Sequence, residues 1–294
     1  MMYRSLLVVL GVLTGCAGGM LSPDEFDDSE DVGDALSAFV RIEAGTFAMG
    51  SAPGEIGRDA DEEIHLVTIT RPYYLGRMEV TQADWRDVAR NDPSHFRGCD
   101  DCPVDSVNYW DALAYLNHIS SVAGFAPCYT LIGCDGTPGV NFECETASYD
   151  HSTCDGFRLP TEAEWEHAAR ADTNTAFHNG IMVDERCSDT GLGAIGWYCG
   201  NAQERTNAVG TLASNGWGLH DTSGNLWEWV WDRYGEYEGD ADDPLGPPAG
   251  DIRVVRGGGW YSLARECRSA NRGAEGPSYR SGDLGFRVAR TEFR

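Results

Sequence analysis

The sequence predicts a single α+β domain over residues 39–294 that is irregular, rich in loops and held together by disulfides. Glycine is abundant, with 36 residues, and favours many turns at positive φ over a helical bundle. Strand-like and helix-like patterns are mixed without an internal repeat, and no long low-complexity linker interrupts them. The chain has 294 residues, of which 41% are hydrophobic, so one sizeable core can be filled.

Strands are expected where β-branched and aromatic residues gather between turn residues. The domain opens with an alternating run at Phe39-Val40-Arg41-Ile42, followed by residues 45–50. After residue 171 the chain is mostly loops and short strands rich in Trp and Gly. The strand-like runs are, in order, residues 39–42, 65–70, 73–75, 253–256 and 285–290.

Three helices are expected between these strands. The first begins at Thr81, whose side chain can cap the helix amino terminus. The second covers residues 107–119, where apolar residues recur at helical spacing. The third covers residues 161–170, where Thr161 and Glu164 form the pattern of a capping box.

The first sixteen residues have the features of a bacterial export signal. Arg4 precedes an apolar run at residues 6–12, which is too short to cross a bilayer as a helix. Leu13-Thr14-Gly15-Cys16 then resembles a lipobox, at which processing attaches lipid to Cys16 and cleaves before it. The alternative is an ordinary secretory signal cut elsewhere. We expect a protein of the cell envelope, on the outer membrane if the cell is Gram-negative, that meets membrane only through the lipid.

The remaining charge pattern restricts the partners. Residues 17–38 are acidic with little apolar periodicity and are interpreted as a disordered tether. The whole chain has a formal net charge of -25, which argues against nucleic acid or an anionic membrane as a partner. Such a surface tolerates or binds divalent cations. We expect a monomer.

Nine cysteines follow Cys16, and an oxidising compartment makes disulfides the first interpretation. An odd number leaves at least one cysteine unpaired. A zinc site at Cys99 and Cys102 is the alternative for that pair, but no second pair with suitable spacing follows. Proximity favours Cys99–Cys102, Cys128–Cys154, Cys134–Cys144 and Cys187–Cys199, although sequence alone cannot fix the connectivity.

Several short motifs occur in a fixed order along the chain: Glu79-Val80-Thr81, residues 103–104 with 110–112, 158–166, 218–229, 255–260 and 268–272, and Gly285-Phe286-Arg287. Together they resemble the sulfatase-modifying-factor family, whose founding member is the formylglycine-generating enzyme. The match runs from about residue 39 to residue 290. The resemblance implies a variant of the C-type-lectin-like fold, with limited regular structure and much loop.

The resemblance also implies a calcium ion at the Gly-Asn-x-Trp-Glu-Trp motif. Asp221 and Glu228 would supply side-chain oxygens, while Gly224 and Leu226 would supply backbone carbonyls. Calcium takes several hard oxygen ligands, and two carboxylates in one tight loop repel unless a cation lies between them. The alternative is that Asp221 caps a turn and Glu228 pairs with an arginine.

A second calcium site of the family would use Asn201-Ala202 and an acidic residue further along. The chain passes quickly to Val209-Gly210, and the acidic loop is missing. Asn201 is therefore expected to be a turn residue or at most a partial ligand.

The sequence departs from the family at the catalytic cysteines. Formylglycine generators use two cysteines, five positions apart, to hold copper, because Cu(I) prefers soft thiolates. Here Gly257-Gly258-Gly259-Trp260-Tyr261 is followed by Ser262. Counting on without a gap puts Cys267 at the second cysteine position, whereas alignment from Arg268-Ser269-Ala270 makes Cys267 an ordinary position. Only one thiol remains in either case, so copper-dependent oxidation is not expected.

Two functions follow as hypotheses. The first is a non-catalytic, calcium-stabilised module that binds a peptide or a glycan in a groove of aromatic and arginine side chains. The second is an oxidoreductase of the same family that generates formylglycine or oxidises another substrate, through Cys267 or another metal. The alternative for the groove residues is ordinary core packing and salt bridges. The groove would be lined by Trp217, Trp260, Tyr261, Arg265, Arg268 and Arg272.

Overall fold

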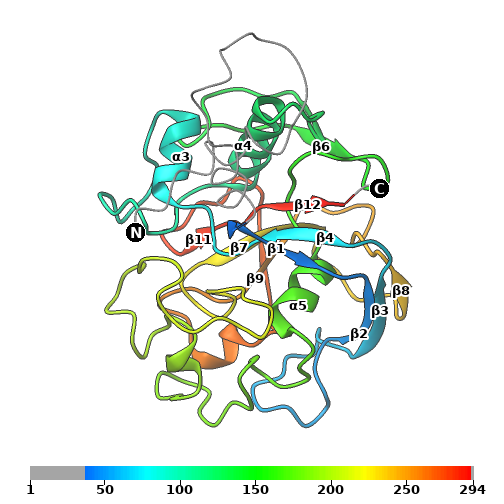
Figure 1. The fold of residues 1–294 in the computed structure, drawn as a ribbon, viewed down its shortest axis with the longest axis vertical. Helices are drawn as coiled ribbons and strands as arrows, with labels where there is room; N and C mark the ends of the chain where they lie inside the picture. Colours follow the sequence, from blue (N-terminus) through cyan, green and yellow to red (C-terminus); the bar gives the residue numbers. More distant parts are fainter. Residues whose placement is uncertain (1–36, 293–294) are drawn as a thin grey trace, which may run out of the picture.

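The computed structural model describes residues 37–292, which form small sheets and three α-helices (Figure 1). Many of the buried core side chains are aromatic. The sheet orders are β1-β4-β12, β10-β9-β7-β11, β2-β3-β8 and β5-β6. The predicted signal segment 1–16 with Cys16, and all of the predicted tether 17–38 except its last two residues, lie outside the described residues. In residues 37–292 no helix combines the length and the apolar character that crossing a membrane requires.

The strands are short, and the longest, β7, has seven residues. They are β1 (Phe39–Ile42), β2 (Gly45–Met49), β3 (His65–Ile69), β4 (Tyr73–Gly76), β5 (Tyr129–Ile132), β6 (Thr146–Tyr149), β7 (Trp227–Arg233), β8 (Ala241–Asp242), β9 (Arg253–Arg256), β10 (Arg272–Glu275), β11 (Leu284–Gly285) and β12 (Ala289–Thr291). The helices are α3 (Gln82–Ala89), α4 (Tyr109–Val122) and α5 (Glu162–Arg170), with 3-10 turns η1 (Leu192–Ala194) and η2 (Ala264–Cys267).

All three α-helices begin with a capping box, which explains why their starts are visible in the sequence. The caps are Thr81 for α3, Asn108 for α4 and Thr161 for α5, each bonded to the third residue of its helix. The prediction for α3 and α5 is confirmed. Helix α4 differs from the predicted residues 107–119, because Asn108 takes the cap position and the apolar face continues to Val122.

The strand predictions are confirmed at β1, β3, β4 and β9 and need one correction. The run at residues 285–290 is not one strand, because the chain leaves β7 after Gly285 and joins β4 only at Ala289. Strand β7 has five consecutive buried residues. A strand covered on both faces has no alternating pattern, and so β7 is hidden in the sequence.

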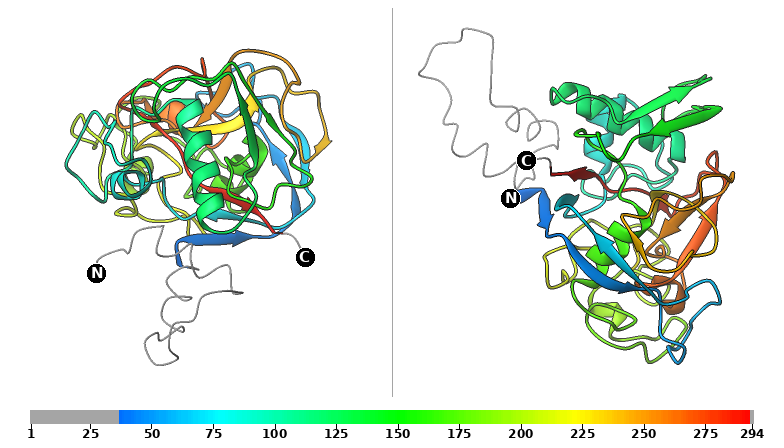
Figure 2. Two further views of the ribbon diagram at one scale, coloured as in Figure 1. Left: turned by 90° about the horizontal axis from the view of Figure 1, so that it is seen from above. Right: turned by 90° about the vertical axis from the view of Figure 1, so that its right-hand side faces the viewer.

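The main core lies between α3, α4 and the central strands. Trp85 stacks on Tyr115 at a ring-centroid distance of 5.4 Å, and Tyr109 meets Trp229 edge to face at 5.7 Å. In Figure 1, α3 and α4 lie on one side of β7 and β11, and α5 lies on the other. Hairpin β5–β6 extends beside α4 (Figure 2). The layers therefore bury both faces of β7.

Helix α5 is buried along its whole length although it carries three glutamates. Each glutamate pairs with an arginine from another part of the chain: Glu162 with Arg272, Glu164 with Arg158 and Glu166 with Arg256. Arg158 also donates to the hydroxyl of Thr291 in β12. Since a buried charge is tolerated only with a partner, these pairs fix where β9, β10 and β12 meet α5.

The four predicted disulfides are confirmed. The bonded pairs are Cys99–Cys102, Cys128–Cys154, Cys134–Cys144 and Cys187–Cys199. Because both predicted zinc ligands are joined in a disulfide, the zinc alternative at Cys99 and Cys102 does not hold. Cys267 is the free cysteine of the described chain, and it is buried.

We predict that Glu164→Gln strongly destabilises the fold. Burial raises the pKa of Glu164, but Arg158 outweighs this effect and holds the pKa below its ordinary value. Glutamine would leave the guanidinium of Arg158 buried without a counter-charge, so the free energy of unfolding should fall by about 3–5 kcal/mol. Urea denaturation of the oxidised protein measures this. Glu43→Gln, at an exposed ion pair with Arg41, is the control and should leave the unfolding curve unchanged. Equal curves for Glu164→Gln and wild type would contradict the prediction.

Candidate functional site

The loop that would carry the family's cysteines packs tightly against the end of the domain. Gly258 has φ +76°, and a Cβ atom there would lie 2.6 Å from the sulfur of Cys267. A Cβ atom on Gly259 would lie 2.9 Å from the Cβ of Asp283. Glycine at these two positions therefore lets the loop lie directly on η2 and on the residue before β11.

Neither Ser262 nor Cys267 is available at the surface. Ser262 is 2% exposed, and its hydroxyl accepts a hydrogen bond from the backbone N–H of Gly259 at 3.1 Å. Cys267 is 0% exposed, and burial raises the pKa of its thiol. A reactive cysteine needs an accessible thiolate, so Cys267 has the surroundings of a structural residue. The sequence alignment that makes Cys267 an ordinary buried position agrees with this environment.

Three aromatic side chains form a partly exposed surface beside that loop, and we call it the aromatic face. Trp260 meets Phe96 edge to face at 5.4 Å and Tyr261 at 4.9 Å. The indole N–H of Trp260 donates to the carbonyl of Gly282, which fixes the ring. Tyr261 is 55% exposed, and the negative charge of Asp283 raises the pKa of its hydroxyl. The aromatic face (Phe96, Trp260 and Tyr261) therefore offers held apolar rings next to an acidic edge.

Two of the other predicted groove residues are buried in ion pairs. Arg268 is buried and binds Glu62 and Glu55, and Arg272 is buried against Glu162. Trp217 packs against His167 of α5. Arg265 is exposed. Arg268 and Arg272 therefore cannot line an open groove as predicted, because they are used as counter-charges inside a glutamate-rich core.

Asp105 lies behind the aromatic face and is fully buried. One of its carboxylate oxygens accepts hydrogen bonds from the N–H of His95 and the hydroxyl of Ser106, and the other has no partner in the described structure. Burial raises the pKa of Asp105 to about 6. No sequence pattern singles out this residue, because its partners come together only in the fold.

Glu79, Asp221 and Glu228 meet in the centre of the domain, where they face Arg287, and we call this group the acidic cluster. Arg287 donates to both carboxylate oxygens of Glu228, at 2.5 and 2.6 Å, and Trp165 donates to one of them. The predicted alternative, that Glu228 pairs with an arginine, is therefore what the structure contains. One oxygen of Asp221 accepts from the N–H of Gly210, and its Oδ1 is buried without a partner in the described chain.

The acidic cluster holds more negative than positive charge. Burial and the charges of Asp221 and Glu228 raise the pKa of Glu79 well above its ordinary value, and burial raises the pKa of Asp221 to about 6. Glu79 belongs to a motif visible in the sequence, although its place beside Asp221 cannot be read from spacing. Within residues 37–292 no group of three or more His, Cys, Asp or Glu side chains is arranged to hold a metal ion by itself.

Asn201 is a turn residue in the structure. Its side-chain oxygen accepts from the N–H of Tyr198, and its amide nitrogen donates to the carbonyls of Gly193 and Gly196. The carbonyl of Ala202 accepts from the side chain of Asn207. Both residues are therefore engaged within the loop.

Comparisons with known proteins place the chain in a family. The family model described as "Sulfatase-modifying factor enzyme 1-like domain" matches residues 25–292. The formylglycine-generating enzyme of Streptomyces coelicolor is 30% identical over 289 residues, which cover 85% of this chain and 88% of that protein. The "Chaperone protein LppX" of Paenibacillus barcinonensis is 29% identical over 243 residues, which cover 75% and 80%.

Comparisons with solved structures agree with this family assignment. Treponema denticola variable protein 1 superposes with a TM-score of 0.75 at 30% identity and covers 86% of this chain and 95% of its own. PvdO from Pseudomonas aeruginosa shares the fold, with a TM-score of 0.69 at 23% identity over 86% and 94% of the two chains. The chain belongs to the sulfatase-modifying-factor family, and the predicted irregular, disulfide-linked α+β fold of that family is confirmed.

We predict that Asp105 makes stability depend on pH in a defined window. The folded protein keeps the Asp105 proton up to about pH 6, while the unfolded chain releases it near pH 4. Because the folded state binds more protons in this window, the free energy of unfolding should fall as the pH rises from about 4 to about 6. Between these two pH values the free energy of unfolding of the wild type should fall by on the order of 2 kcal/mol more than that of Asp105→Asn. Urea denaturation at each pH measures this. Parallel curves for the two proteins would refute this role.

Proposed function

We propose that this protein is a non-catalytic member of its family: a calcium-stabilised recognition module, lipid-anchored outside the cytoplasm, that binds a peptide or a glycan. The observation that carries the proposal is the state of Ser262 and Cys267, the two residues that stand at the family's cysteine positions when the motif is aligned without a gap. One is the Ser262 hydroxyl, which is bonded to its own loop, and the other is the fully buried thiol of Cys267. A hydroxyl and an inaccessible thiol do not fit the soft, paired donor set that Cu(I) requires.

The aromatic face supports recognition. Trp260 and Phe96 are fixed by packing, and Tyr261 stands 55% exposed beside them. Rigid rings with a polar edge bind peptide side chains or sugar rings at a small entropic cost. One relative is named a chaperone, a class of protein that binds other polypeptides, which favours a peptide over a glycan.

An oxidoreductase is the second candidate, and the similarity to the formylglycine-generating enzyme of Streptomyces coelicolor favours it. It would act on a cysteine-containing or other substrate through Cys267 or another metal. This candidate requires that the thiol of Cys267 become accessible, since it is 0% exposed.

We predict that the two candidates separate in a copper(I) titration. The oxidised wild-type protein and Cys267→Ala should bind the same amount of copper(I). The wild type should form no formylglycine in a cysteine-containing peptide. On peptide and glycan arrays, Tyr261→Ala should abolish the signals that the wild type gives. Stoichiometric copper that disappears in Cys267→Ala would establish the enzyme instead. Array signals that persist in Tyr261→Ala would exclude the aromatic face as the surface that binds the ligand.

Some of the residues in the acidic cluster support the proposal of a calcium site, and others fit it less well. The Oδ1 of Asp221 is a buried carboxylate oxygen without a partner in the described chain, and such an oxygen is a fitting ligand for calcium. Glu228 fits less well, because Arg287 and Trp165 engage both of its oxygens, so it would share one oxygen with the ion. We propose that Asp221, the carbonyls of Gly224 and Leu226, and one oxygen of Glu228 hold the ion, and that the ion balances the excess negative charge.

We predict that calcium stabilises the wild type through Asp221. At saturating calcium, the Tm should rise by about 5 °C relative to excess EDTA, because binding to the folded state alone adds a few kcal/mol. Asp221→Asn should lose most of this rise. Asp105→Asn, which changes another buried carboxylate with an unpartnered oxygen, is the matched control and should keep it. A calcium response that is equal in wild type and Asp221→Asn would remove calcium from this site.

The location outside the cytoplasm is supported by the disulfides, since four such bonds are typical of proteins that fold in an oxidising compartment. We predict that the wild type, made in a bacterial host, sediments with membranes and carries lipid on Cys16. Cys16→Ser should carry no lipid and should keep its signal segment, because processing attaches lipid to Cys16 and cleaves before it. Cell fractionation and mass spectrometry of the amino terminus measure this, and a wild-type protein without lipid on Cys16 would contradict lipid anchoring.

A further inference from the structure

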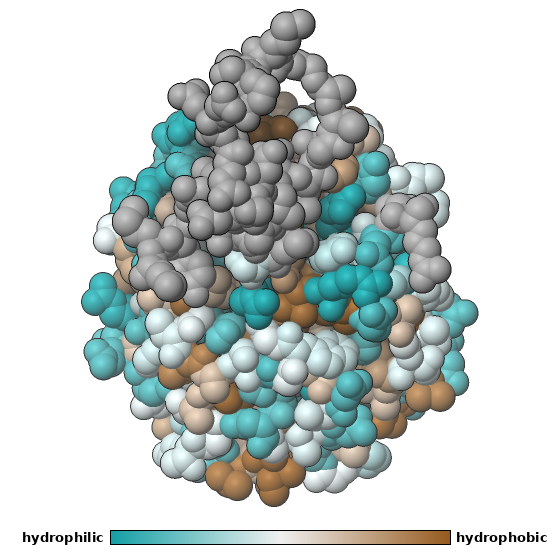
Figure 3. Space-filling view, in the orientation of Figure 1, coloured by the Kyte–Doolittle hydropathy of each residue, from teal (hydrophilic) through white to brown (hydrophobic). Residues whose placement is uncertain are grey.

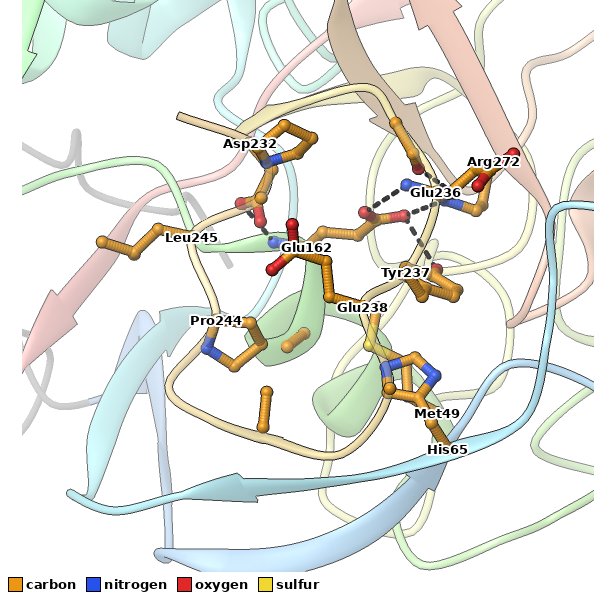
Figure 4. A pocket seen from close by; sticks show the side chains of 16 residues that line it. Met49, His65, Glu162, Asp232, Glu236, Tyr237, Glu238, Pro244, Leu245 and Arg272 are labelled. Atoms are coloured by element: carbon orange, nitrogen blue, oxygen red, sulfur yellow. Dashed lines mark hydrogen bonds and ion pairs between the residues drawn. The ribbon is translucent and has the colours of Figure 1, made fainter. Parts of the chain in front are cut away.

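A small pocket lies under the loop at residues 234–247, and neither the aromatic face nor the acidic cluster contributes to its lining (Figure 4). Its volume is about 250 Å³. It is bounded by the end of β7, the start of α5 and the loop that leads into and out of β8. This size suits one side chain or a small molecule and not an extended ligand.

A buried carboxylate with a free oxygen faces this pocket. Asp232, at the end of β7, is 2% exposed. Its Oδ2 accepts a hydrogen bond from the N–H of Glu162 at 2.8 Å, while no described residue donates to its Oδ1. In Figure 4 the side chains of Asp232 and Glu238 both point into the pocket.

The neighbouring charges leave Asp232 without a counter-ion. Glu162 is bonded through both carboxylate oxygens to Arg272, so that guanidinium is already used. The other titratable groups that line the pocket are Glu236, Glu238, Tyr237 and His65. Burial and the charge of Glu162 raise the pKa of Asp232 well above its ordinary value. A cation placed beside Asp232 would supply the compensation that its surroundings lack.

The walls of the pocket select the kind of cation. They include Met49, Ala163, Pro244, Leu245 and Pro247, all of which present apolar surface. An alkyl chain gains from such walls, and a hydrated metal ion does not. A guanidinium prefers two oxygens of one carboxylate, whereas an ammonium needs a single acceptor point. Since Asp232 offers one free oxygen, an ammonium fits better.

We propose that this pocket binds a primary alkylammonium group, such as a lysine side chain, with the nitrogen at Asp232 and Glu238 and the alkyl chain against the apolar wall. The inference is independent of the calcium site and of the aromatic face. The net charge of -25 adds a long-range attraction for such a cation. The source of the ammonium is either a lysine on another protein or a free amine.

Isothermal titration calorimetry of the full mature protein tests this site with N-acetyl-lysine amide and with n-butylammonium. Saturable binding with Kd on the order of millimolar is expected, since the probes are small. Tighter binding of the lysine amide indicates a protein lysine, and equal binding indicates a free amine. N-acetyl-norleucine amide, which has the same chain without the charge, should not bind.

Asp232→Asn keeps an acceptor for the N–H of Glu162 and removes the charge, so it should weaken binding about tenfold or more. Glu238→Gln changes an exposed loop residue and gives a second test if Asp232→Asn unfolds at low temperature. Glu204→Gln, an exposed carboxylate that does not line the pocket, is the control and should bind like the wild type. Absence of binding in the wild type, equal binding of the norleucine amide, or unchanged affinity in both Asp232→Asn and Glu238→Gln would overturn the proposal.

Discussion

The pairing of three buried glutamates on α5 with three arginines is the constraint on which the rest of the domain depends. The helix is short and has no exposed face, so its carboxylates cannot be hydrated. Their partners come from residue 158, from β9 and from β10, and Glu166 also accepts the N–H of Gly50. The pairs of Glu162 with Arg272 and of Glu166 with Arg256 join segments that are 110 and 90 residues apart. They hold these segments in one arrangement, as a continuous hydrophobic core does in more regular folds.

The same kind of charge pairing holds the loop that contains Ser262 and Cys267. Arg268 is bound to Glu62 and Glu55, and this pair anchors the segment that follows Cys267. Gly258 allows the loop to close over the sulfur of Cys267. The loop is therefore held by charge pairs and close packing, neither of which requires a second cysteine at Ser262. On the part of the face that Figure 3 shows for the described residues, hydrophobic and hydrophilic residues are interspersed.

Local signals make much of this structure predictable, and distant contacts limit the rest. Helix α5 is predictable to the residue because Thr161 and Glu164 specify its start without help from other segments. Proximity along the chain indicates the right cysteine pairs because each partner lies within 26 residues of the other, although proximity alone does not fix the connectivity. Strand β7 escapes prediction because burial on both faces removes the alternation of apolar residues.

Which side chains meet in each site is harder to predict than the helices and strands that carry them. Glu79 beside Asp221, and Asp232 beneath an acidic loop, depend on contacts between distant segments that one sequence does not reveal. Arg268 and Arg272 resemble groove residues in the sequence because their glutamate partners lie far away along the chain.

The sheet order β1-β4-β12 has a consequence for how the chain reaches its folded state. Strand β4 pairs with the first described strand on one edge and with the last one on the other. The amino-terminal sheet is therefore incomplete until the final residues arrive, and Arg158 lacks Thr291 until then. In a chain that leaves the ribosome amino terminus first, the sheet of β1, β4 and β12 cannot be complete before residues 289–291 have emerged. Closure of this sheet therefore depends on contacts between residues that are more than two hundred positions apart in the sequence.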